Sequence, residues 1–306
     1  MQTFFALTRR NIKLYFKDKG MFFSSLITPL ILLVLYATFL AKVYRDSFSG
    51  AIPQDFHVEN LSGLIDGMVG AMLLSSLLAV CCVTVAFCSN LVMVQDKYTG
   101  VRKDLLVTPV KKSVLSLSYF AGTYLNTLIV CFIACAAGFV YLAVIGWYMS
   151  FADVCLVISD VMLLSLFGTA LSSIVNSFLT SQGQMSAVGT VVSAGYGFIC
   201  GAYMPISQFG EGLRNFLGFM PGTYGTSLIK THALNGVFRE MAAQGFPDEV
   251  INGSAEHIGI KESVDSTLRF FGKEVSEGAS YAVLIGSIVL LIGIYVLINV
   301  LRKKRR

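Results

Sequence analysis

Long apolar segments dominate the pattern of hydrophobic and polar positions along the chain. An α-helix needs about 20 apolar residues to cross a bilayer, whereas the strands of a membrane β-barrel alternate over about ten residues. Uninterrupted apolar runs that meet the helical requirement, with Asp160 as their only carboxylate, cover residues 21–41, 67–94, 119–145, 154–174, 185–203 and 281–300. The pattern therefore predicts six transmembrane helices in an all-α membrane protein.

The composition excludes a soluble globular protein. Hydrophobic residues make up 55% of the chain and charged residues only 13%, and the mean hydropathy is +0.71; soluble domains carry about 25% charged residues. All seven cysteines lie within or at the edges of the apolar runs, so a disulfide framework is not expected. The three histidines are scattered outside the runs and give no zinc-site spacing.

Positive charge is concentrated in three segments, namely residues 1–20, 95–112 and 302–306. These segments hold 15 of the 23 Lys and Arg residues and three carboxylates. Because Lys and Arg are enriched in cytoplasmic flanks, the distribution predicts a multi-pass plasma-membrane protein with both termini in the cytoplasm. Anionic lipid headgroups account for the basic balance, and nucleic acid is not an expected partner.

Two cytoplasmic segments outside the runs have amphipathic patterns. Residues 3–18 place basic side chains on one helical face and apolar side chains on the other, which predicts a helix lying in the headgroup plane; a basic leader that only sets topology is the alternative. Between Gly100 and Pro109, the apolar Val101, Leu105 and Leu106 share a short predicted helix with charged residues. Such a helix offers a docking surface for another protein.

The segment after the fifth run is too apolar for a free loop and too short to cross the membrane. Residues 201–224 therefore predict a re-entrant or interfacial helical pair, since irregular backbone at membrane depth must be shielded by protein. From His232 to Ser280 the composition turns polar, which predicts a small outer cap.

Small and polar residues recur inside three of the runs. Four-residue spacing in the second and fifth runs favours close helix packing, and a polar stripe in the fourth run is predicted to bond to a neighbouring helix. The predicted second helix carries Gly63, Gly67, Ala71, Ser75 and Ala79; the fifth carries Gly189, Ser193, Gly197 and Gly201; the stripe on the fourth is Ser165, Thr169, Ser172 and Asn176.

The chain lacks the motifs of an enzyme or of an ion-driven carrier. It has no G-x-x-x-x-G-K-[ST] loop, no H-E-x-x-H and no G-x-S-x-G, so we expect no catalytic residue, metal site or ATP site within it. Ion-driven carriers place ionisable groups at mid-membrane, where this sequence has none. The energy for transport is then expected from a partner at the cytoplasmic docking helix.

These features resemble the membrane subunit of an ABC-2 type ATP-binding cassette exporter, a family of bacterial drug and polysaccharide exporters related to the eukaryotic white-type transporters. The resemblance rests on the amphipathic leader, the six runs, the loop from Gly100 to Thr108-Pro109-Val110, and the later spacing of Gly201, Pro205, Pro221 and Tyr224. It implies an ABC-2, type V exporter-like fold. It also implies a separate ATPase subunit that binds ATP and Mg.

The resemblance also assigns roles to residues. It makes 95–110 the coupling helix that contacts the ATPase, through Asp96, Gly100, Arg102, Asp104, Thr108 and Pro109. Gly201, Pro205, Pro221 and Tyr224 would form the re-entrant motif. The family forms dimers, here a homodimer or a pair with a related permease, with a pathway between helices two and five. The path candidates, which suit an amphipathic cargo, are Met68, Met72, Ser75, Tyr196 and Phe198.

The expected organisation and function follow from this resemblance. A connecting helix (1–20) precedes transmembrane helices one to five (21–203), re-entrant helices and outer cap (204–280), and a sixth helix with a basic cytoplasmic tail (281–306). The expected function is export of a drug, antimicrobial peptide or lipid-like molecule. The alternatives are a secondary carrier or channel, and a membrane sensor or scaffold that transports nothing.

Overall fold

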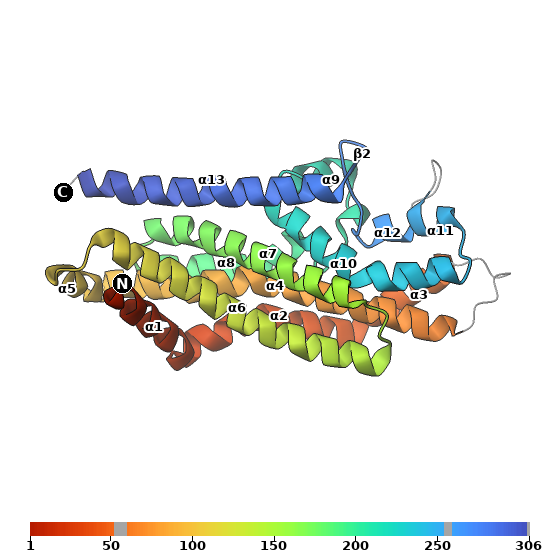
Figure 1. Ribbon diagram of the computed structural model, residues 1–306, viewed down its shortest axis with the longest axis horizontal. Coiled ribbons are helices and arrows are strands. Elements are labelled where there is room, and N and C mark those ends of the chain that lie inside the picture. Colours follow the sequence, from red (N-terminus) through yellow and green to blue (C-terminus); the bar gives the residue numbers. More distant parts are fainter. Residues whose placement is uncertain (52–59, 254–258, 305–306) are drawn as a thin grey trace.

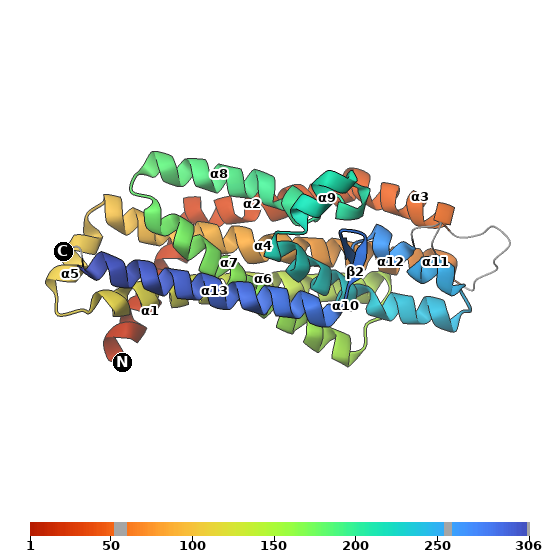
Figure 2. The same ribbon diagram turned by 90° about the horizontal axis from the view of Figure 1, so that it is seen from above.

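The fold is an elongated bundle of helices with a small hairpin at one side (Figures 1 and 2). The computed structural model describes residues 1–51, 60–253 and 259–304. The elements in chain order are α1 (Gln2–Lys17), α2 (Lys19–Leu35), a π-helical turn (Tyr36–Leu40), α3 (Ala41–Ala51), α4 (Leu61–Tyr98), α5 (Val101–Val107), α6 (Lys112–Ile145), α7 (Phe151–Phe178), α8 (Gln182–Ile199), a 3-10 turn (Ile206–Gln208), α9 (Glu211–Leu217), α10 (Pro221–Ala243), α11 (Asp248–Asn252), α12 (Ile260–Ser263), β1 (Leu268–Phe270), β2 (Lys273–Val275) and α13 (Glu277–Lys304).

Helix α4 forms the centre of the bundle. It packs against α2, α6, α7, α8 and α10, and 94% of its most apolar stretch is buried. A helix that is apolar all round is expected to be enclosed by others. Figure 1 places α5 and both termini at one end of the bundle, and α3 and α11 at the other.

Among the described residues, five helices are long and apolar enough to cross a membrane: Lys19–Asp46, Leu61–Tyr98, Lys112–Ile145, Phe151–Phe178 and Glu277–Leu301. The fifth of the six helices predicted from the sequence is not among these candidates. The fifth run forms α8, which has only 18 residues, and glycine, serine and glutamine lower its hydropathy. Figure 2 nevertheless shows α8 running along the bundle beside α2.

The polar stripe on α7 bonds across to neighbouring helices, as predicted. Asn90 of α4 donates to the hydroxyls of Ser172 and Ser173 at 3.2 and 3.0 Å, and Asn176 donates to the Phe87 carbonyl at 3.3 Å. These contacts hold α7 close along the length of α4.

A short two-stranded hairpin interrupts the helices between α12 and α13. The antiparallel hairpin β1–β2 pairs Leu268 with Val275 and leads directly into α13. Helix α10 is not a polar cap element, because it packs along α4, α7 and α13 with most of its residues buried. The histidines His57 and His257 lie outside the described residues.

Candidate functional site

A short helix, α5, projects from the end of α4 where the docking helix was expected. Gly100 ends α4 with φ +88°, a left-handed conformation that favours glycine, and the hydroxyl of Thr108 donates to the Leu105 carbonyl at 2.6 Å as α5 ends. Leu105 and Leu106 pack against the core, whereas Asp104, Thr108 and Pro109 are exposed. Arg102 is half-buried. The helix thus presents a charged outer face on an apolar base.

Asp96 does not point toward a partner, which corrects the expectation that it contacts the ATPase. Its side chain is 6% exposed and accepts two hydrogen bonds from the Arg10 guanidinium, at 2.7 and 2.9 Å. The hydroxyl of Tyr119 donates a third at 2.5 Å. Asp96 therefore joins α1, α4 and α6 at the base of α5. The hydrogen bond to Asp96 raises the pKa of the Arg10 guanidinium above its ordinary value.

Lys97 ties the same end of α4 to α7. Its ammonium donates to the carbonyls of Asn176, Ser177 and Leu179, at 2.9, 2.8 and 3.1 Å. The last carbonyls of a helix have no partner within the helix, and a lysine there also interacts favourably with the helix dipole. Neighbouring side chains at one helix end therefore fasten α4 to three other helices.

The residues expected to form the re-entrant motif lie together at the start of the outer region. Gly201 has φ +72°, and an added Cβ would lie 2.9 Å from an Asp265 carboxylate oxygen. Pro205 precedes the 3-10 turn, Pro221 begins α10, and the Tyr224 hydroxyl donates to the Gly218 carbonyl at 2.7 Å. Together these residues turn the chain from α8 through α9 into α10.

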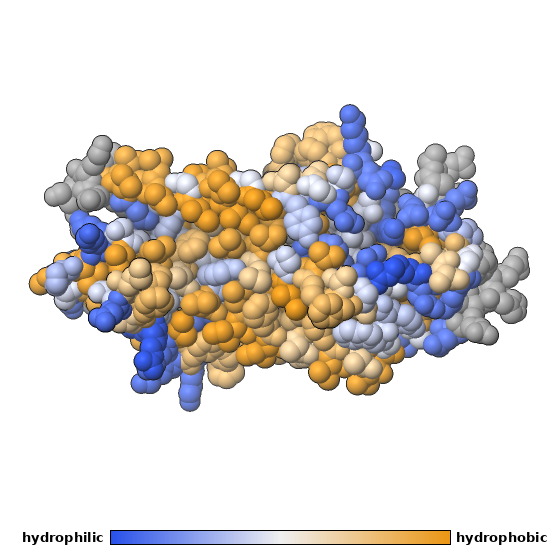
Figure 3. Space-filling view, in the orientation of Figure 1, coloured by the Kyte–Doolittle hydropathy of each residue, from blue (hydrophilic) through white to orange (hydrophobic). Residues whose placement is uncertain are grey.

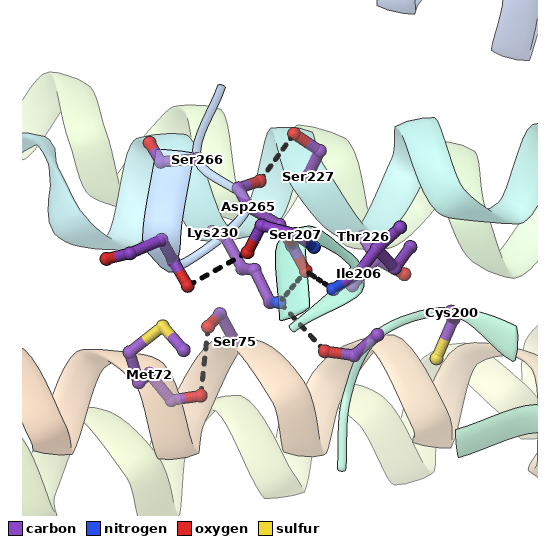
Figure 4. A network of polar contacts seen from close by, with 12 residues as sticks. Met72, Ser75, Cys200, Ile206, Ser207, Thr226, Ser227, Lys230, Asp265 and Ser266 are labelled. Carbon is purple, nitrogen blue, oxygen red and sulfur yellow. Dashed lines mark hydrogen bonds and ion pairs between the residues drawn. The ribbon is translucent and has the colours of Figure 1, made fainter. Parts of the chain in front are cut away.

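A buried ion pair holds this turn in place (Figure 4). The Lys230 side chain on α10 is fully buried and donates to the Gly201 carbonyl at 2.8 Å and to Asp265 at 3.1 Å. The Asp265 carboxylate also accepts the backbone N–H groups of Ile206 and Ser207, at 2.7 and 2.9 Å. Sequence reasoning did not detect this network, because its members are up to 64 positions apart and neither charge lies in an apolar run.

The five path candidates do not form one surface in the single chain. Met68, Met72 and Ser75 of α4 are enclosed by the chain's own helices, and Tyr196 of α8 is buried as well. Phe198 is 55% exposed on α8. The structure therefore leaves α8, rather than α4, accessible from outside.

Asp160, the lone carboxylate in the apolar runs, forms a buried cluster that sequence reasoning missed. Its oxygens lie 2.5 Å from Nδ1 of His232 on α10 and 2.6 Å from the donating hydroxyl of Tyr281 on α13. Burial alone lowers the pKa of His232, but the hydrogen bond and charge of Asp160 outweigh it and hold that pKa above its ordinary value. The sequence signal was Asp160 itself, since a carboxylate in an apolar run needs a partner.

The comparison with protein families supplies one match. A family model described as ABC-2 type transporter matches residues 2–231, which include every element from α1 to the first half of α10. Comparisons with curated proteins and with solved structures gave no match.

Proposed function

Because the chain belongs to the ABC-2 type transporter family, we propose that it is the membrane-spanning permease subunit of an ATP-binding cassette exporter. It moves an amphipathic molecule, such as a drug, an antimicrobial peptide or a lipid-like compound, out of the cell. A separate ATPase subunit binds ATP and Mg and supplies the energy. The observation that carries this proposal is α5, an exposed short helix whose base is fastened to the bundle.

The contacts at the base of α5 support its role as a coupling helix. The closing ATPase pushes on α5, and the push reaches α4 through Gly100. Since Asp96 binds α1 and α6 and Lys97 binds α7, these helices move with α4 rather than past it. The helices tilt together and open the pathway to the outer side. The positive charge near α5 supports a cytoplasmic location for this end of the bundle and for both termini.

The exposure of α8 supports a dimer. Only Tyr196 and Gly197 of its residues are buried, and an added Cβ at Gly183, Gly189 or Gly195 would have open space around it. Small residues on a membrane helix allow close approach of another helix. A second copy, or a related permease, packs against α8. This contact shields α8, the sixth membrane-crossing helix of the proposal, from lipid, which its small and polar residues suit poorly.

The coupling role is tested by replacing the charged face of α5. We expect Arg102→Ala with Asp104→Ala to reduce both co-purification of the ATPase encoded by a neighbouring gene and ATP-dependent transport in inverted vesicles. Lys112→Ala, an exposed cation at the other end of the same connection, is the matched control and should leave both unchanged. Unchanged ATPase binding and transport in the double variant would show that α5 is not the coupling helix.

A proton-coupled carrier is the second candidate, and the Asp160 cluster is the observation that favours it. A buried carboxylate bound to a histidine is typical of proton sites in membranes. Liposomes that contain this chain alone and a pH gradient discriminate the two: gradient-driven uptake supports the carrier, and its absence together with ATP-dependent transport when the ATPase is present supports the exporter.

A further inference from the structure

A small, partly open cavity lies in the outer region, between α9, the hairpin and α10. Three charged side chains share one wall of it: Arg214 of α9, Arg269 of β1 and Glu262 of α12. Glu262 is 7% exposed, lies 3.0 Å from Nε of Arg269 and 3.9 Å from the nearest nitrogen of Arg214. Two guanidinium groups thus share a single carboxylate, which leaves this wall with one positive charge in excess.

The hydrogen-bond donors at this wall outnumber the acceptors. Nε of Arg214 is buried and has no hydrogen-bond partner within the described part of the chain. The other carboxylate that lines the cavity, Asp265, is already occupied by Lys230 and the backbone of the re-entrant turn. A buried donor without an acceptor is costly, so the wall is suited to an added anionic oxygen.

An exposed apolar surface borders the cavity. This outer aromatic patch consists of four large side chains that are roughly half exposed or more: Leu213, Phe216, Phe219 and Phe271. Phe270 lines the cavity and packs edge-on against Phe219 and Phe271, with ring centroids 5.1 and 4.7 Å apart, so the patch and the cavity are continuous. Figure 3 shows apolar side chains gathered over α9, beside hydrophilic ones.

The position of the patch identifies what covers it. The hairpin ends at Val275, two residues before Glu277 begins the last candidate membrane span, and Figure 1 shows α9 and the hairpin beside the start of α13. Helices that lie in the membrane interface carry side chains such as Phe and Leu on the face that enters the boundary between acyl chains and headgroups. Arginines next to them face the phosphate level.

We propose that Arg214 and Arg269 bind the phosphate of an anionic phospholipid in the outer leaflet, while the outer aromatic patch contacts its acyl chains. Free phosphate and a phospholipid headgroup both present a phosphate oxyanion to the arginines. The adjoining outer aromatic patch favours the phospholipid, because only the phospholipid has acyl chains to cover it. The site is separate from the transport pathway at α8. The placement of this site in the outer leaflet rests on the orientation given under the proposed function. Lipid binding itself needs neither the ATPase nor transport, so a failure of the lipid proposal would not affect the test of the coupling helix.

The test uses the full chain and its single tryptophan. Trp147→Phe with Phe216→Trp moves that fluorophore to the patch. The variant is reconstituted in equimolar phosphatidylglycerol and phosphatidylcholine, with bromine, a contact quencher, on the acyl chains of one lipid or of the other. Because composition is constant, the ratio of the two quenching efficiencies measures preference. We expect quenching by brominated phosphatidylglycerol to be about two- to fivefold greater, as a partly exposed charge pair supports.

Three variants in that background decide the assignment. Arg214→Gln with Arg269→Gln should bring the ratio to one. Lys273→Gln, an exposed cation on the same hairpin that does not line the cavity, should keep the preference. Glu262→Gln retains both arginines and removes the competing charge, so it should raise the ratio; it tests the site even if the double variant fails to fold.

Several results would overturn the proposal. A ratio of one in the parent, or an equal loss with Lys273→Gln, would show no specific lipid site. Absence of quenching by either lipid would show that protein, a second copy or another partner, covers the patch. Loss of the preference on adding millimolar inorganic phosphate would show a site for free phosphate instead.

Discussion

The contact between Arg10 and Asp96 makes a quantitative prediction about how α1 is held. Arg10→Gln removes the positive charge that neutralises the buried carboxylate of Asp96, and among the native contacts described the Tyr119 hydroxyl remains as its side-chain donor. Removing one partner from a buried ion pair costs about 3–5 kcal/mol. Because the Arg10 side chain is 29% exposed and water reaches that side, we expect the free energy of unfolding to fall by about 2–3 kcal/mol.

Arg9→Gln is the matched control for this measurement. Arg9 is the preceding residue on α1, is exposed, and forms no salt bridge within the described ranges 1–51, 60–253 and 259–304. Exposed substitutions of this kind change stability by about 0.5 kcal/mol or less. Both variants are unfolded from mixed micelles by increasing sodium dodecyl sulfate, and helix loss is followed by circular dichroism.

A double-mutant cycle separates the pair from other effects of each change. Arg10→Gln with Asp96→Asn should cost less than the two single variants added together, since the double variant has no unpaired charge. We expect a coupling energy of at least about 1 kcal/mol. Equal stability of Arg10→Gln and Arg9→Gln, or a coupling energy of zero, would refute the reasoning that Asp96 fastens α1 to the base of α5.

Three further predictions concern other parts of the bundle. The pKa of His232 is raised in the folded chain, so its contribution to stability is complete below the unfolded pKa of about 6.5 and is lost as pH rises through the folded pKa. The free energy of unfolding, measured from pH 6 upward, should therefore decline less in His232→Gln than in the unchanged chain. Equal slopes in the two proteins would contradict this. Gly236→Ala should destabilise by about 1–3 kcal/mol, because its Cβ would lie 2.1 Å from a carbonyl oxygen in the α6–α7 connection, whereas Gly293→Ala, in open space on α13, should be neutral or slightly stabilising in the same unfolding assay. In a background in which the exposed Cys155 is replaced, Val191→Cys on α8 should form a disulfide-linked dimer on oxidation in membranes, and Val289→Cys on α13 should not. The two valines are similarly exposed, at 70% and 66%, so exposure alone does not separate them. The reverse pattern on denaturing gels would place the dimer contact elsewhere.

Periodicity and hydropathy predicted local elements well, because those properties depend on neighbouring residues. The run at 119–145 lies within α6, and Gly100 and Pro109 bound α5. The fifth run was the exception, since its small residues suit a helix that packs against protein and give a low hydropathy.

Partners distant in the sequence could not be predicted in this way. Asp96 lies in a basic segment that is predicted to be cytoplasmic, and the sequence therefore predicted that it contacts another protein. Its actual partner, Arg10, is 86 positions away and meets it only because α1 folds back against α4 and α6. Likewise His232 lies in a stretch that reads as polar, yet α10 packs it against Asp160. Side-chain chemistry alone does not determine which helices become neighbours.

The enclosure of α4 has a consequence for how the chain is made. Asn90 of α4 finds its partner Ser172 only 82 positions later. At a synthesis rate of about 5–20 residues per second, the ribosome adds that length in about 4–16 s. During that interval the Asn90 amide lacks its α7 partners, although α2 and α6 are already made, and lipid cannot satisfy that amide. We therefore expect the α7-facing side of α4 to stay shielded from lipid by other protein until α7 has been made.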